Sequence, residues 1–222
     1  MREQILPFYV VCDESFSMSD HIDALNDGLR ELHRAIGTDP VVADKTRFCL
    51  IGFSTTAEVL LPLSDLSDIT EIAGLTAKSA TNYIGAFDLL RETIEKDIAI
   101  LKAEGHLVYR PAVFFISDGL PTDSRPWRPA YRRLVDQSWS PRPNIIAFGI
   151  GDALADIIRE VGTFKAFMSQ DGVSPGTALH EFARALTKSI VKSGSSIADN
   201  GSLTLQVPEQ IPGFTELEVD PL

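Results

Sequence analysis

Two unbroken apolar runs, each ending at an aspartate, constrain the fold of this chain more than any other feature. Residues 5–12 read I-L-P-F-Y-V-V-C and precede Asp13, and residues 112–117 read A-V-F-F-I-S and precede Asp118. Apolar strands without alternating polar residues are typical of parallel sheets that are covered by helices on both faces. We therefore expect two central strands that end at the edge of the sheet where ligands bind.

The rest of the first 192 residues alternates between strand and helix patterns. Apolar residues recur at helical spacing over residues 22–36 and again over 82–103. The remaining strands are expected at residues 47–53, 57–63, 145–150 and 164–168, and the remaining helices at 127–137, 153–161 and 176–192. The short link between the first two of these strands allows only an antiparallel hairpin. The pattern predicts a three-layer, doubly wound α/β fold whose mostly parallel sheet has one antiparallel edge strand.

The composition changes after Lys192. The length of 222 residues suits one domain with a short appendage, so we assign residues 1–192 to the domain and 193–222 to an acidic C-terminal tail. This tail is either a disordered leash or contains one extra strand, at residues 203–207, that pairs with a sheet edge or a partner. In the second case residues 208–222 would dock on a surface.

The charge balance excludes two classes of partner. The chain has 20 basic and 31 acidic side chains, a formal charge of −11. Nucleic acids and anionic membranes need clustered Lys and Arg, so we expect neither as a partner. No run approaches the roughly 18 apolar residues of a membrane span, and the first residues lack the pattern of a signal peptide. The sequence predicts a soluble cytoplasmic protein in which Cys12 and Cys49 are reduced.

Three polar clusters stand where a ligand of such a sheet would bind. They are D-E-S-F-S at residues 13–17, S-A-T-N at 79–82 and S-D-G-L-P-T-D at 117–123. A hard divalent cation prefers oxygen ligands, and Mg²⁺ also keeps several waters. The clusters offer two carboxylates and three hydroxyls for such an ion: Asp13, Asp118, Ser15, Ser17 and Thr81.

In this order, the three clusters resemble the metal-ion-dependent adhesion site of von Willebrand factor A (VWA) domains, and the resemblance covers about residues 5–192. It implies a Rossmann-like fold and a site for Mg²⁺, or for Ca²⁺ or Mn²⁺. The implied metal ligands are Asp13, Ser15, Ser17, Thr81 and Asp118. It also implies a partner protein whose Glu or Asp completes the coordination, so that the chain acts in recognition as an adaptor or scaffold.

Longer stretches are similar to one small bacterial branch of that family, which is associated with tellurite-resistance and stress-response operons. They are P-F-Y-V-V-C-D-E-S-F-S-M-S, F-S-T-T-A-E-V and I-S-D-G-L-P-T-D. This resemblance alone implies a stress-response or phosphorylation-linked system. Phe16 stands where that branch usually has Gly, and a bulky residue there disfavours positive φ.

A basic segment with interleaved aromatic residues follows the third cluster, at residues 125–133. It either forms a rim that holds a phosphate or an acidic partner beside the metal, or it is a solvated helix face with Trp127 and Leu134 packed inward. The residues assigned to a partner-binding rim are Phe16, Asn82, Arg125, Trp127 and Arg128. The oligomeric state stays open.

The competing function is a metal-dependent phosphohydrolase that uses the same pocket. Phosphatases of the haloacid dehalogenase type need a second Asp two residues after the nucleophile, and Ser15 stands there. The chain has no G-x-S-x-G elbow, and its four histidines match no zinc spacing. We therefore expect no enzyme.

Four acidic residues, Asp13, Glu14, Asp118 and Asp123, also have interpretations that involve no metal. Asp13 and its counterpart after the second run could cap helices without any metal. Glu14 is expected to face solvent, and Asp123 to cap the helix that follows it.

Overall fold

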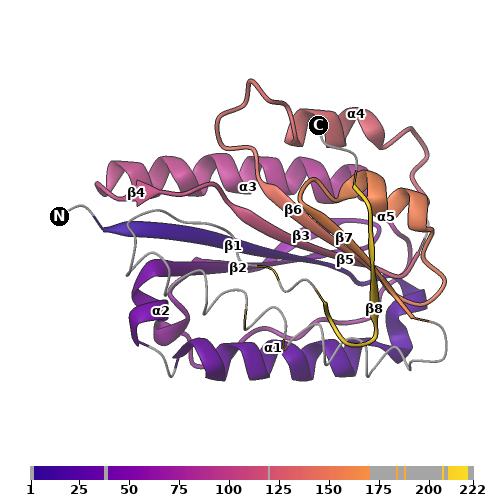
Figure 1. Ribbon diagram of the computed structural model, residues 1–222, viewed down its shortest axis with the longest axis horizontal. Helices are drawn as coiled ribbons and strands as arrows, with labels where there is room; N and C mark the ends of the chain where they lie inside the picture. Colours follow the sequence, from indigo (N-terminus) through magenta and orange to yellow (C-terminus); the bar gives the residue numbers. More distant parts are fainter. Residues whose placement is uncertain are drawn as a thin grey trace.

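The computed structural model describes residues 3–37, 40–119, 121–170, 184, 188, 207 and 210–219, and within them one sheet lies between two layers of helices (Figure 1). The strands are β1 (Gln4–Asp13), β2 (Thr46–Phe53), β3 (Ala57–Ser64), β4 (Leu107–Val108), β5 (Ala112–Ser117), β6 (Asn144–Gly149), β7 (Lys165–Ser169) and β8 (Phe214–Leu217). The α-helices are α1 (Ile22–Gly37), α2 (Pro40–Lys45), α3 (Tyr83–Ala103), α4 (Arg128–Leu134) and α5 (Ala155–Val161). Two 3₁₀ helices are η1 (Phe16–Asp20) and η2 (Leu66–Asp68).

The strand order is β3-β2-β1-β5-β6-β7-β8, with β4 paired to the start of β1. The strands from β2 to β7 in this order are parallel to their neighbours, whereas β3 and β8 are antiparallel. This confirms the mostly parallel α/β fold, and it adds a second antiparallel edge strand to the one that the hairpin predicts. The predicted helix at 176–192 and strand at 203–207 lie outside the described residues, apart from residues 184, 188 and 207.

The central strand β1 separates two apolar cores. Its side chains point alternately to the two faces of the sheet. Phe8 and Val10 pack with the α1 side, and Tyr9 and Val11 pack with α3 and α4. Both faces are covered by helices, as Figure 1 shows, so the strand has no solvated side that would select polar residues.

The second core is held by a cluster of aromatic rings under α3. Tyr83 and Phe87 of α3 lie with ring centroids 5.1 and 5.5 Å from Phe115 of β5. Trp127 and Tyr131 contact Phe87 from the α4 side, at 5.9 and 5.4 Å. These contacts fix the start of α3 against the end of β5, which sets where the second and third polar clusters meet.

The edge strand β8 completes the far side of the sheet. Phe214 is 6% exposed, and its ring meets Phe148 of β6 edge-on at 5.5 Å. Glu216 pairs with Lys165 of β7 at 2.8 Å. Gly213, with φ of +82°, makes the turn that leads into the strand. Within the segment that was expected to dock on a surface, residues 214–217 therefore form an edge strand of the sheet.

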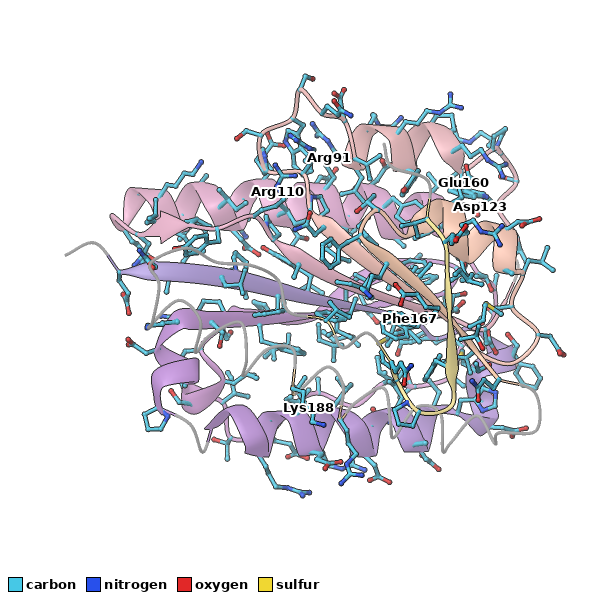
Figure 2. All side chains as sticks on the ribbon, viewed as in Figure 1. Arg91, Arg110, Asp123, Glu160, Phe167 and Lys188 are labelled. Atoms are coloured by element: carbon cyan, nitrogen blue, oxygen red, sulfur yellow. The ribbon has the colours of Figure 1, made fainter. Side chains whose placement is uncertain are left out.

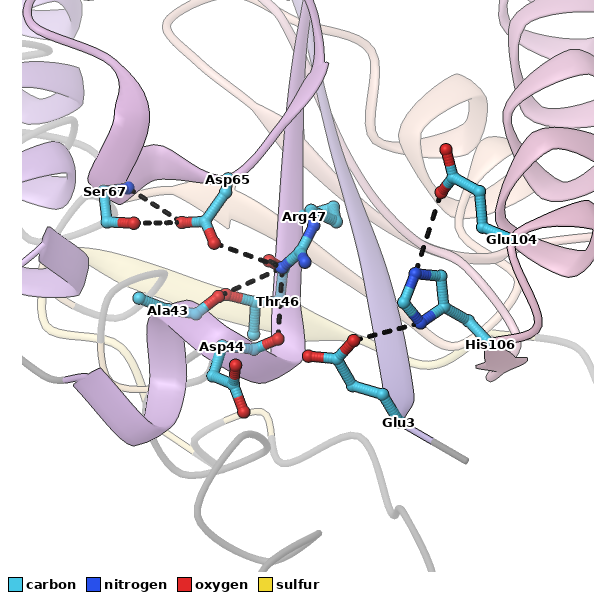
Figure 3. Close-up of polar contacts among 9 residues, drawn as sticks. All are labelled: Glu3, Ala43, Asp44, Thr46, Arg47, Asp65, Ser67, Glu104 and His106. Atoms are coloured by element: carbon cyan, nitrogen blue, oxygen red, sulfur yellow. Dashed lines mark hydrogen bonds and ion pairs between the residues drawn. The ribbon is translucent and has the colours of Figure 1, made fainter. Parts of the chain in front are cut away.

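Polar contacts tie the start of β2 to its neighbours (Figure 3). Arg47 Nη1 donates to the carbonyl oxygens of Ala43, Asp44 and Thr46 and lies 3.5 Å from Asp65 Oδ2. The Nη1 group of this guanidinium is thus surrounded by acceptors of the chain itself. No helix among the described residues has the length and apolar character needed to cross a bilayer.

We predict that Phe214→Ala destabilises the fold by about 3 kcal/mol, because it removes a buried ring that packs on Phe148. Urea unfolding followed by circular dichroism measures the change. Leu154→Ala is the control, since this side chain is 48% exposed and its loss should change the free energy of unfolding by less than about 0.5 kcal/mol. Equal stability of the two variants would contradict a packed edge strand.

Candidate metal centre

The parallel pairing of β1 with β5 brings the two strand-end aspartates to one edge of the sheet. Cys12 is in register with Ile116, so Asp13 and Ser117 follow side by side. Ser117 Oγ donates a hydrogen bond of 2.6 Å to Asp13 Oδ2. Asp13 is fully buried, and Asp118 is 8% exposed. Two carboxylates are therefore held close together with little access to water.

The serines of the first cluster link these carboxylates. The Ser15 backbone N–H donates to Asp13 Oδ1 at 2.9 Å, and the Ser15 and Ser17 hydroxyl oxygens are 3.0 Å apart. Ser17 Oγ then donates to Asp118 Oδ1 at 3.0 Å. The spacing of two residues in the cluster is what places both hydroxyls on the same side.

The third hydroxyl reaches the same place from the second cluster. Thr81 is 4% exposed, and its backbone N–H donates to Thr122 Oγ1 at 3.0 Å. The Thr122 N–H donates in return to the Thr81 carbonyl at 2.8 Å. A Cβ added at Gly119 would lie 3.7 Å from Ser17 Oγ and 3.8 Å from Thr81 Oγ1, so both hydroxyls flank this glycine.

A cavity of about 720 Å³ opens above these groups. Four of the five predicted ligands line it, namely Ser15, Ser17, Thr81 and Asp118, while Asp13 lies buried beneath. His21 and Asp152 also line the cavity, and the sequence analysis missed both. Asp152 follows the carboxyl end of β6, a position that could have pointed to it, whereas His21 belongs to no motif.

Burial dominates the electrostatics of both aspartates. It raises the pKa of Asp13 to about 6, against the opposing effect of the hydrogen bonds from Ser117 and Ser15. Burial likewise raises the pKa of Asp118, and the hydrogen bond from Ser17 opposes it. Within the described part of the chain, no Lys or Arg forms an ion pair with either carboxylate.

The donor set fits a hard divalent cation. The oxygens of two carboxylates and three hydroxyls converge, which is the chemistry that Mg²⁺ and Ca²⁺ prefer. The described residues hold no group of three or more His, Cys, Asp and Glu, in keeping with a set in which most side-chain ligands are neutral hydroxyls. A cation bound here would offset the charge that burial disfavours.

Glu14 does not face solvent, so the expectation for this residue is wrong. It is 1% exposed, and its two carboxylate oxygens accept from the Thr76 N–H and from Lys78 Nζ, each at 2.8 Å. Lys78 also pairs with Glu58 at 2.6 Å. The carboxylate fits here because residue 52 of β2 is a glycine. A Cβ added at Gly52 would overlap Glu14 Oε2. The buried pair fastens the second cluster to the first.

The start of α3 is capped twice. Asp123 accepts from the backbone N–H groups of Tyr83 and Ile84 at 3.1 and 2.9 Å. Asn82 Oδ1 accepts from the Gly85 N–H at 2.9 Å. Asp123 thus caps the helix that precedes it in sequence, and the expectation that it caps the following one is wrong. The Asn82 side chain is engaged in the cap.

The structure places none of the basic segment's predicted rim residues on the cavity. Trp127 is 5% exposed and belongs to the aromatic cluster, as in the alternative with an inward-packed tryptophan. Arg128 makes a two-pronged pair with Glu160, at 2.6 and 2.8 Å. Arg125 is exposed and is not among the lining residues. Phe16, 75% exposed, stands between the two cavity-lining serines.

A family model, that of the von Willebrand factor type A domain, matches residues 8–120. No curated protein matches the sequence. Proximal thread matrix protein 1 from the mussel byssus is 14% identical with a TM-score of 0.58, over 86% of this chain and 49% of that one. A second structure of that protein, with the same identity and score, covers 86% and 48% and has a zinc-occupied MIDAS motif.

The ArnB paralog VWA2 from Sulfolobus acidocaldarius is 22% identical with a TM-score of 0.51, over 82% of this chain and 46% of that one. The chain therefore spans about half the length of these proteins. At these identities the likeness concerns the fold.

We predict that Glu14→Gln lowers the free energy of unfolding by about 2 kcal/mol, because it removes the charge from a buried acceptor of Lys78. Glu58→Gln is the matched control: it removes the other carboxylate on the same lysine, but Glu58 is 57% exposed, so the loss should stay below about 1 kcal/mol. Urea titrations of both variants compare them. A larger effect at Glu58 would show that Glu14 does not fasten the clusters.

Proposed function

The chain belongs to the von Willebrand factor type A domain family, and on this premise we propose that it is a metal-dependent protein-interaction module that binds a carboxylate of a partner protein. The observation that carries the proposal is the meeting of two buried carboxylates and three hydroxyls at one cavity. This set contains ligands for an ion, and the cavity of about 720 Å³ above it has room for a side chain of a partner.

The residues that would hold the ion are Asp13, Ser15, Ser17, Thr81 and Asp118. Mg²⁺ is the proposed metal, with Ca²⁺ or Mn²⁺ as alternatives, because all five side chains offer hard oxygen atoms. When bound, the ion would supply a Lewis-acidic position for an incoming Glu or Asp. Two carboxylates match the charge of a divalent ion, and the three hydroxyl ligands add no further negative charge. An open coordination position on the ion could therefore still accept a third carboxylate, from the partner.

The surrounding residues would keep these ligands in place. Ser117 holds Asp13 Oδ2, and the Glu14–Lys78 pair fastens the loop that carries Thr81. Phe16 is the exposed apolar group beside the ligand serines and would contact the partner around its carboxylate. Such a pairing of a central charge with an aromatic neighbour is common at interaction hot spots.

A role as adaptor in a bacterial stress-response or phosphorylation-linked system rests on the sequence resemblance alone and is proposed on that ground. No structural observation favours the metal-dependent phosphohydrolase. Turnover of a generic phosphoester that disappears in Asp13→Asn would support that alternative.

We predict that Mg²⁺ or Mn²⁺ raises the melting temperature of protein treated with a chelator. At a metal concentration 100 times the dissociation constant, the stabilisation should be about 2.7 kcal/mol. Asp13→Asn and Asp118→Asn should lose most of this gain, since each removes a carboxylate ligand. Asp156→Asn, whose side chain is 91% exposed, is the matched control and should keep it. A full gain in Asp13→Asn would rule out the assigned site.

We predict that partner binding depends on the metal and on Phe16 separately. Wild-type protein should retain its partner in an affinity pull-down, and retention should fall at least tenfold with a chelator or in Asp13→Asn. Phe16→Ala should keep the melting shift with metal yet weaken retention, because it alters the contact surface and no ligand. The same retained proteins in equal amounts under all conditions would contradict metal-mediated binding.

A further inference from the structure

A second cavity, of about 440 Å³, lies at the opposite edge of the sheet from the metal centre. Arg110 stands just before β5, and Asn144 is the first residue of β6. Thr163 precedes β7, and Arg142 lies in the loop between α4 and β6. These are the amino ends of strands, whereas the aspartates stand at the carboxyl ends. The six residues of β5 alone separate the two edges by about 20 Å.

The lining of this cavity runs against the charge of the chain. Acidic residues outnumber basic ones by 31 to 20 overall, yet the described residues of the lining include two arginines and no Asp or Glu. The arginines are close enough to affect each other: burial lowers the pKa of Arg110, and the charge of Arg142 adds to this effect. Two like charges at one cavity favour an anion between them.

Arg110 differs from other arginines at this edge in that no described residue pairs with its side chain. Among the described residues it forms no hydrogen bond and no ion pair, although Arg91, labelled near it in Figure 2, pairs with Glu95 and stacks on Trp139. Arg47, at the same edge, is surrounded by four acceptors. The guanidinium of Arg110 is thus available to a ligand.

Arg142 is oriented by the protein but only partly used. Its Nη1 donates to the Gln137 carbonyl at 2.9 Å, which leaves the other N–H groups of its guanidinium without an acceptor in the described part of the chain. The nearby Asp136 carboxylate accepts from the backbone N–H and hydroxyl of Ser138, and it forms no ion pair with Arg142 within the described residues. Both lining arginines also directly precede a proline, which restricts their backbone to extended conformations and so preorganises the pair.

Asn144 and Thr163 add neutral donors to the lining, which also contains Gln137. The Asn144 side-chain amide has no hydrogen-bond partner among the described residues. The backbone N–H of Asn144 donates to the carbonyl oxygen of Pro111. Thr163 Oγ1 accepts from the Ile145 N–H at 2.8 Å, so its own hydroxyl hydrogen can still be donated. The described lining therefore offers two guanidinium groups, two side-chain amides and a hydroxyl, and none of these described residues is acidic.

We propose that this cavity binds a phosphate group in its dianionic form. Two positive charges match the charge of the dianion, and donors from several directions suit a tetrahedral oxyanion better than a planar carboxylate, which one arginine can satisfy with two parallel bonds. The phosphate can be free or part of a small organic monoester. The site involves none of the residues of the metal centre and does not depend on the function proposed for it.

Calorimetric titration with inorganic phosphate tests the proposal. The buffer contains a chelator, so that no divalent ion can bridge phosphate to the metal centre. Its pH lies well above the second pKa of phosphate monoesters, about 6, and also above the higher second pKa of inorganic phosphate, so that both ligands are dianions. Wild-type protein should bind one phosphate saturably. Arg110→Gln and Arg142→Gln should each weaken binding by about tenfold or more, because each removes charge-assisted hydrogen bonds.

Arg132→Gln is the matched control, because it removes the same charge from an exposed position on α4 outside the cavity lining. It should leave phosphate binding unchanged. Arg110→Gln breaks no contact of the described residues, so its melting temperature should equal that of the wild type and a loss of binding would not reflect unfolding. Absence of saturable binding, or an equal loss in Arg132→Gln, would overturn the proposal.

Two further titrations identify the ligand. Phenyl phosphate that binds more tightly than inorganic phosphate would point to a monoester, and weaker binding would point to free phosphate; either supports the site. Acetate that binds as tightly as phosphate, with the same dependence on Arg110, would overturn the assignment to phosphate and leave a carboxylate site.

Discussion

The hydrogen bond from Ser117 to Asp13, across the junction of β1 and β5, is the contact on which the candidate metal centre depends. It fixes the orientation of a carboxylate that has no access to water. Burial of two carboxylates at one strand edge is costly, and it raises the pKa of both. The neighbouring groups are arranged around this constraint: hydroxyls and a backbone N–H solvate the anions from one side, and the cavity leaves the other side accessible to a cation.

The two edges of the sheet carry buried or clustered charges of opposite sign. At the carboxyl edge, buried Asp13 and Asp118 have only neutral donors in the described part of the chain, and the implied compensation is a metal ion. At the amino edge, Arg110 and Arg142 face a cavity whose described lining has no acidic side chain, and the proposed compensation is an anion. A net charge of −11 therefore conceals local surfaces of both signs.

The sequence predicted the central strands and the meeting of the three polar clusters because both follow from rules that act along the chain. A run buried on both faces needs no partner to be recognised, and parallel strands place their carboxyl ends together. What the sequence could not predict depends on contacts across the sheet. Glu14 is buried because β2 has a glycine opposite it, and Trp127 turns inward because α3 and β5 supply an aromatic cluster.

The same reasoning explains β8. Its four residues expose Thr215 and Glu216, so no periodic pattern marks them, and the strand forms only because β7 offers an open edge and Phe148 a contact for Phe214. The hydrophobic run at residues 203–207 is the stronger local signal. Edge strands of this length are defined by the sheet that they join, and sequence patterns alone do not find them.

Phe16 separates the chemistry of the site from its specificity. The resemblance to the bacterial branch implies that this position needs the freedom of glycine, yet no non-glycine residue of the described chain has a positive φ. The loop instead enters η1, where buried Met18 anchors it and the phenyl ring is left 75% exposed. Phe16 therefore leaves the serine hydroxyls on the carboxylates and shapes the surface that surrounds them. Under the proposed function the ion ligands and the residue at the mouth of the cavity are separate, so the contact with a partner can change while the ligands stay the same.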